Sequence, residues 1–177
     1  MTHLTLMWFA MMAAMMAPTA WPWVRAYARF GGGSPIVFAS GYLAAWFGYS
    51  FAAAGLQSVT RAPTAIAPLI LVLAGAYQFS PAKRACLTHC RNPFSYFLAR
   101  WKNGPANGFR MGVEHGLYCL GCCWALMATM IAVGLTNMWW MALLAGVTFV
   151  EQVVPRGQKL RVPLGVGLLG AGIWPLV

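Results

Sequence analysis

Charged residues are scarce in this 177-residue chain, and acidic ones are almost absent. Charged side chains make up 8% of the sequence, and the only two carboxylates are Glu114 and Glu151; an average soluble domain carries about 25% charged residues. So few carboxylates argue against a calcium site or a carboxylate-based hydrolase. The chain also lacks a His-Glu-x-x-His motif, and its Gly31-Gly32-Gly33 run has no strand or lysine context for a nucleotide site. No catalytic residues are recognisable, and enzyme activity is not the expected function.

Long apolar stretches are abundant instead. Apolar residues form 60% of the sequence, and its mean hydropathy is +0.65. Because a membrane-spanning helix needs roughly 20 such residues, the pattern predicts an all-α, polytopic transmembrane helix bundle of about six helices in a single integral membrane domain. The predicted segments are about 4–24, 35–57, 65–79, 109–134, 138–154 and 162–177. In the first segment, Pro18 and Pro22 predict a kink or an end of the helix.

Positive charges divide unevenly between the links that join these segments. Eleven of the twelve Lys and Arg residues lie in or next to the links after the first, third and fifth segments, and only Arg61 lies on the other side. By the positive-inside rule, this asymmetry predicts a multi-pass membrane protein with both termini outside. The net charge of +10 is therefore interpreted as facing the lipid bilayer, not nucleic acid. The longest link is an inner basic loop, 80–108, in which 82–90 are predicted to form a short helix on the membrane surface.

One stretch, from Glu114 to Met127, gathers three of the five cysteines and a histidine inside the fourth segment. In a helix, His115 and Cys119 are one turn apart, and Cys122 and Cys123 follow at the next i+3 and i+4 steps, so the four can share one face. A rise of ~1.5 Å per residue puts the cysteines near the bilayer midplane. Soft ligands in a hydrocarbon region predict metal binding or redox chemistry.

The two carboxylates also need partners in such surroundings. Glu114 must face protein, water or a metal, so it is a candidate metal ligand, and Arg110, one turn before it, is a candidate ion-pair partner. Glu151, near the end of the fifth segment, is expected to approach Glu114 or His115, or else to pair with Arg156.

Two further groups of soft ligands accompany the cysteine stretch. Four methionines repeat at i,i+4 spacing in the first segment, at a similar depth: Met11, Met12, Met15 and Met16. Thioethers favour Cu(I), although methionine also fills gaps in apolar cores without any metal. In the inner loop, Cys86, His89 and Cys90 lie at i, i+3 and i+4. They could hold a metal at the cytoplasmic face, although thiols in a reducing cytosol are often simply free.

Several of these motifs together resemble a known bacterial family. They are Ala14 to Pro18, Gly75 to Phe79, Lys83 to Arg91 and, most specifically, His115 to Met127. The chain is similar over about 8–157 to a domain of unknown function described as predicted metal-binding integral membrane proteins, some of whose members are labelled copper chaperones. The resemblance implies a multi-pass protein of the bacterial inner membrane that binds a metal, with copper as the suspected one.

Three hypotheses follow from the sequence. The first is Cu(I) handling or delivery to a metalloenzyme, with His115, Cys119, Cys122 and Cys123 as main ligands, the four methionines as a second cluster, and Cys86, His89 and Cys90 as an inner entry or exit site. The second is a membrane thiol–disulfide oxidoreductase, since Cys119 and Cys122 form a C-x-x-C. The third is a non-catalytic accessory subunit of a larger membrane complex, in which Gly- and Ala-rich faces pack against other chains.

Overall fold

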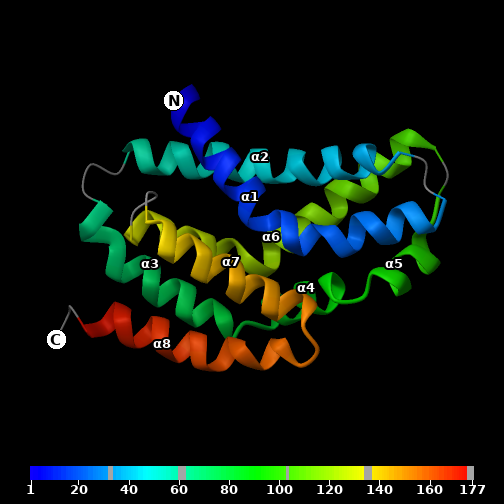
Figure 1. Cartoon of the computed structure of the whole chain (residues 1–177). Helices are drawn as coiled ribbons and strands as arrows, with labels where there is room; N and C mark the ends of the chain where they lie inside the picture. Colours follow the sequence, from blue (N-terminus) through cyan, green and yellow to red (C-terminus); the bar gives the residue numbers. More distant parts are fainter. Residues whose placement is uncertain (32–33, 60–62, 103, 134–136, 175–177) are drawn as a thin grey trace.

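A computed structural model describes residues 1–31, 34–59, 63–102, 104–133 and 137–174, and these ranges are helical almost throughout. They hold eight α-helices and one short 3₁₀-helix, and no strand (Figure 1). In chain order the elements are α1 (Thr2–Arg29), α2 (Pro35–Val59), α3 (Pro63–Gln78), α4 (Pro81–Cys90), α5 (Pro93–Arg100), α6 (Pro105–Val133), α7 (Met138–Val153), η1 (Gly157–Leu160) and α8 (Arg161–Ile173). The predicted all-α class is confirmed.

The long helices alternate in direction along the bundle. Figure 1 shows α1 beginning and α8 ending at one end of the bundle, with α5 toward the other. Helices α1, α2 and α6 are each long and apolar enough to cross a membrane, and α7 and the part of α3 from Ile66 to Gln78 are shorter apolar helices. Length and composition thus indicate membrane association. The count of six spans and the outside position of the termini stay predictions.

The first helix does not end at its prolines. α1 continues through Pro18 and Pro22 as far as Arg29, beyond the predicted boundary near residue 24. Each proline removes one backbone donor, but neighbouring side chains can satisfy the carbonyls that remain, as is common in membrane helices. The Thr19 hydroxyl, which lies between the two prolines, donates to the Met16 carbonyl at 2.8 Å; the carbonyls that lose a backbone donor are those of Ala14 and Pro18.

The predicted inner loop contains two helices, α4 and α5. Residues 82–90 were expected to form a short helix, and α4 confirms it at Pro81–Cys90. Pro81 suits the first helical position, and the Ser80 hydroxyl caps the helix by accepting from the Ala82 N–H at 3.1 Å. α4 packs against α6 and α7, so the side chains of this link take part in the protein interior.

α6 lies at the centre of the bundle, with α2, α3, α4 and α7 packed around it. Its contact with α2 is made at glycines one turn apart. A Cβ built at Gly112 would overlap the carbonyl oxygen of Phe38, and a Cβ at Gly116 would lie 2.8 Å from the Cβ of Ala45. On the facing helix, a Cβ at Gly41 would overlap the carbonyl oxygen of Phe109. Small residues therefore set the close backbone approach that holds α6 in place.

We expect Gly112→Ala to destabilise the bundle by about 1–3 kcal/mol, because the added methyl group must push α2 away from α6. Gly48→Ala, in α2, is the matched control, since a Cβ there meets nothing within 4 Å. Alanine at that position gains up to ~1 kcal/mol of helix propensity. Thermal unfolding of both detergent-purified variants checks this, and equal melting temperatures would contradict the close-packing argument.

Candidate metal centre

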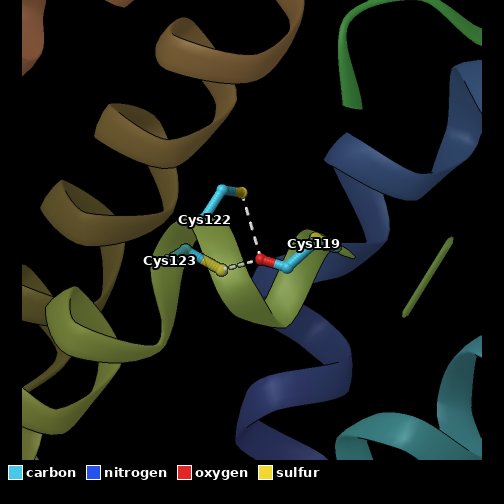
Figure 2. A group of neighbouring side chains, drawn as sticks. All are labelled: Cys119, Cys122 and Cys123. Carbon is cyan, nitrogen blue, oxygen red and sulfur yellow. Dashed lines mark hydrogen bonds between the residues drawn. The ribbon is translucent and has the colours of Figure 1, made fainter. Parts of the chain in front are cut away.

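Three cysteines of α6 form the centre of the candidate site. The Sγ atoms of Cys119, Cys122 and Cys123 all lie within 4.8 Å of one another, and all three residues are buried. The helical i, i+3, i+4 spacing brings them to one face, as the sequence predicts. Figure 2 shows the Cys122 and Cys123 thiols both directed at the Cys119 carbonyl oxygen, to which they donate at 3.0 and 2.8 Å. This carbonyl fixes two of the sulfur atoms side by side.

A fourth thiol comes from α4. The Sγ of Cys90 lies 4.0 Å from the Sγ of Cys122, and Cys90 is buried. Hydrogen bonding to Cys119 and to Cys122, together with burial, raises the pKa of the Cys90 thiol well above its ordinary value. Cys90 is therefore a protonated thiol at neutral pH until a cation displaces the proton. The inner-loop motif that contains Cys90 and the cysteine motif of α6, which the sequence assigns to separate sites, therefore contact each other here.

Two polar side chains that sequence reasoning missed contact the thiol of Cys119. The Tyr42 hydroxyl of α2 lies 3.3 Å from its Sγ, and the Gln152 side-chain oxygen of α7 accepts a hydrogen bond from it at 3.6 Å. Gln152 could have been noticed, because a buried amide in an apolar helix is itself a functional signal. Nothing in the local sequence distinguishes Tyr42 from other aromatic residues.

Two of the three histidines, His89 and His115, lie beside this cluster, and each stacks on an aromatic ring. The His115 ring stacks on Trp23 with centroids 3.8 Å apart, and the His89 ring stacks on Tyr118 at 3.7 Å. Their own ring centroids are 6.3 Å apart. Nδ1 of His115 and Nε2 of His89 are buried without a hydrogen-bond partner in the described part of the chain. Burial lowers the pKa of His89, so its imidazole is neutral at pH 7 and keeps a free lone pair.

The other predicted soft ligands lie at different distances from the thiols. Met11, Met12, Met15 and Met16 are all buried in the same apolar core as the four clustered cysteines. Cys86 is half-buried on α4 and packs on α6, where a Cβ at Gly121 would lie 2.8 Å from its Sγ. Within the described ranges, the only group of three or more His, Cys, Asp or Glu ligand atoms at metal-binding separation is the cysteine trio. His115 is one turn away from that trio and is not a member of it.

Glu114 is bound by protein donors. Its carboxylate pairs with Arg100 of α5 and accepts a hydrogen bond from the Tyr96 hydroxyl at 2.8 Å. The expected partner, Arg110, is therefore not the observed one. The helical i,i+4 rule considers only neighbours on the same helix, whereas α5 folds back beside α6 and supplies its own arginine.

Glu151 also has a partner that the sequence did not predict. It forms an ion pair with Lys83 of α4 at 2.7 Å, with side-chain exposures of only 2% and 1%. Lys83 donates in addition to the Gln78 side-chain oxygen. The partners expected from the sequence, Arg156 or the Glu114–His115 region, are not the observed ones. The reason is that α4 packs against α7 and places Lys83 in the interior.

Thiols, thioethers and neutral imidazoles are soft or borderline ligands, and the buried centre offers no carboxylate among its clustered atoms. Such a donor set fits Cu(I) better than a hard divalent cation. Deprotonation of the thiols on metal binding would supply the anionic sulfur that the ion needs. The chemistry of the cluster is therefore compatible with copper as a bound cargo.

Comparison with protein families agrees with this chemistry. Residues 5–175 match the model of the family described as PpoB2: Copper chaperone, and the chain belongs to that family. Curated proteins and solved structures gave no match. The resemblance drawn from the sequence motifs is confirmed, and copper handling is the function that the family supports.

Proposed function

We propose that this copper chaperone binds Cu(I) through the clustered thiols of Cys90, Cys119, Cys122 and Cys123 and passes it to a metalloenzyme. The observation that carries the proposal is the convergence of four buried thiols from two helices, with Cys90 and Cys122 4.0 Å apart. A cluster of this kind can exchange copper between alternative thiolate pairs. Exchange among equivalent ligands would let the ion move toward a recipient without becoming free in solution.

Charge favours monovalent copper over zinc in this place. Four thiolates around Zn²⁺ leave a net charge of −2, whereas two thiolates around Cu(I) leave −1. The cluster lies in an apolar core, where each uncompensated charge is costly. Thioethers in the same core add neutral soft ligands that stabilise Cu(I) without adding charge. The four methionines of α1 are therefore proposed as accessory ligands or a second cluster.

His89 and His115 are proposed as transient ligands that hold the ion before it reaches the thiols or after it leaves them. A cavity of about 290 Å³ between α5 and α6 is lined in part by Tyr96 and Glu114. The His89 ring contacts Tyr96, with centroids 4.9 Å apart, and lies beside His115. Unpartnered imidazole nitrogens between this cavity and the thiols support a relay from the surface to Cys90. Cys86, half-buried on the same helix, belongs to that route in this proposal.

The proposed setting is the bacterial inner membrane. Three long apolar helices support it, and so does the placement of eleven of the twelve basic residues in or next to alternate links. The proposed topology has six spans, with both termini outside and α4 and α5 inside. The expected partners are the lipid bilayer and a copper-receiving metalloenzyme or another subunit of a membrane complex.

Anaerobic titration of the detergent-purified chain with Cu(I), against a chromogenic chelator, tests the proposal. About one tightly bound copper per chain, with only sulfur and nitrogen scatterers in the X-ray absorption spectrum, is the expected result. Zn²⁺ added under the same conditions should fail to displace it. Free thiols with no retained copper would contradict the proposal.

A second candidate is thiol–disulfide exchange, favoured by the 4.0 Å separation of the Cys90 and Cys122 sulfur atoms. Oxidation of this pair would give an intact mass lower by two hydrogens that reductant restores, and it would need an electron acceptor such as a quinone. Mass analysis of the chain isolated from native membranes separates the two candidates. An accessory-subunit role would instead give free thiols, no copper and stoichiometric co-purifying chains.

A further inference from the structure

A second cavity lies between α4, η1 and the start of α8. Its volume is about 380 Å³, within the range of small-ligand pockets. Most of the lining side chains are polar or cationic, namely Arg84, Thr88, Gln158, Lys159 and Arg161, and the other two are the apolar Leu87 and Val162. The cavity shares no lining residue with the copper site proposed above, and nothing in copper binding requires it.

Three cations meet in this cavity without a carboxylate in its lining. The chain has only two side-chain carboxylates to offer. Glu114 pairs with Arg100, and Glu151 is buried in its ion pair with Lys83, although the charge of Arg161 still influences it. Within the described ranges, Arg84, Lys159 and Arg161 therefore lack an ion-pair partner. Such a concentration of uncompensated positive charge in a concave site calls for an external anion.

An apolar path leads away from the cations along α8. Val162, Val166 and Ile173 are exposed by 45%, 60% and 47%, and their spacing places them along one side of the helix. Thr88 donates its own hydroxyl to the Arg84 carbonyl at 2.9 Å, which leaves its oxygen lone pairs available to accept from a ligand hydroxyl. A ligand with an anionic phosphate, hydroxyl groups and apolar tails would satisfy all of these features at once.

We propose that this cavity binds the headgroup of an anionic phospholipid, with the phosphate between Arg84, Lys159 and Arg161 and the acyl chains along α8. Basic pockets between helices on the cytoplasmic side are typical sites for anionic lipid. The inference rests on the membrane setting of the proposed function, in which the links that bear these cations face inside. A bound phosphate would bridge α4 to α8 and so stabilise the helix that carries Cys90.

Lipid binding can be measured on the metal-free chain in detergent by native mass spectrometry and by thermal unfolding, with phosphatidylglycerol, phosphatidylcholine and inorganic phosphate as probes. We expect phosphatidylglycerol to bind and to raise the melting temperature, and the other two to do neither. The variant Arg84→Gln/Lys159→Gln/Arg161→Gln should bind phosphatidylglycerol on the order of 100-fold more weakly, since each cation near an anionic lipid contributes about fivefold.

The matched control, Arg25→Gln/Arg29→Gln/Arg110→Gln, removes the same charge from exposed positions outside the cavity, and it should bind within about threefold of the unmodified chain. Equal weakening in both variants would overturn the site, and so would saturable binding of inorganic phosphate without lipid selectivity. Copper titration of the cavity variant separates the two proposals. Lost lipid binding with normal copper binding leaves the copper site intact, whereas normal lipid binding in a chain that takes no copper overturns only the copper site.

Discussion

Replacing Cys122 with serine is expected to lower Cu(I) affinity by about 100-fold or more. Even partners that only orient a ligand cost 10–100-fold when removed, and Cys122 is central among the thiols. Its Sγ lies 4.0 Å from that of Cys90 and within 4.8 Å of those of Cys119 and Cys123. Serine keeps the size and the hydrogen bond to the Cys119 carbonyl but offers a hard oxygen to a soft ion. Anaerobic competition with a chromogenic Cu(I) chelator measures the change.

Cys86→Ser is the matched control for this prediction. Cys86 is also a cysteine of the α4–α6 contact, but it is half-buried and outside the thiol trio. We expect its replacement to change Cu(I) affinity by less than about tenfold, below the 10–100-fold that a ligand-orienting residue costs. Melting temperatures of both variants within a few degrees of the unmodified chain would show that the fold is kept. Equal affinity losses in the two variants would argue against the clustered thiols as the ligands.

The sequence predicts the α6 part of the site well, because its geometry is local. Helical periodicity alone puts Cys119, Cys122 and Cys123 on one face, and the structure keeps them there. The position of Cys90 could not be predicted in this way. It depends on how a ten-residue helix packs on α6 and α7, and no spacing rule relates it to Cys122, 32 positions away.

The same limit of local spacing rules explains why the ion-pair partners of Glu114 and Glu151 were not predicted. Spacing rules suggested Arg110 for Glu114 and Arg156 for Glu151, since both arginines are close in sequence. The observed partners are Arg100, 14 positions from Glu114, and Lys83, 68 positions from Glu151. Glu151 is almost fully buried, so it takes the cation that helix packing brings within reach, because leaving it unpaired in an apolar interior costs far more than a local pair gains.

α4 is attached to the bundle by these same polar contacts. Lys83, near its start, is bound to Glu151 and Gln78, and Arg91, just after its end, donates to the carbonyl oxygens of Glu151 and Val154 at 2.7 and 2.9 Å. Both ends of α4 are thereby fixed to α7 or α3, and Cys90 lies between the two attachments. The position of the fourth thiol therefore depends on an ion pair that no copper ligand contributes to.

Lys83→Met is accordingly expected to destabilise the protein by about 3–5 kcal/mol, the usual cost of leaving one member of a buried ion pair unpaired. Glu151 would remain buried without a cation, since both side chains are almost fully inaccessible. Thermal unfolding measures the stability, and the rate of Cys90 alkylation by a maleimide measures whether α4 has loosened. Lys102→Met, at an exposed lysine in the link before α6, should change neither quantity measurably.

The double variant Lys83→Met/Glu151→Leu distinguishes the ion pair from simple packing. Replacing both charges with apolar groups of similar size is often neutral or stabilising by about 1–4 kcal/mol, so the double variant should recover most of the stability that Lys83→Met loses. Alkylation of Cys90 should also become slow again. Without an unpaired buried carboxylate, nothing opposes the packing of α4 on α6. A double variant as unstable as Lys83→Met would mean that Lys83 acts through its contact with Gln78 and its hydrocarbon chain, and that the charge of Glu151 has no part in positioning the fourth thiol.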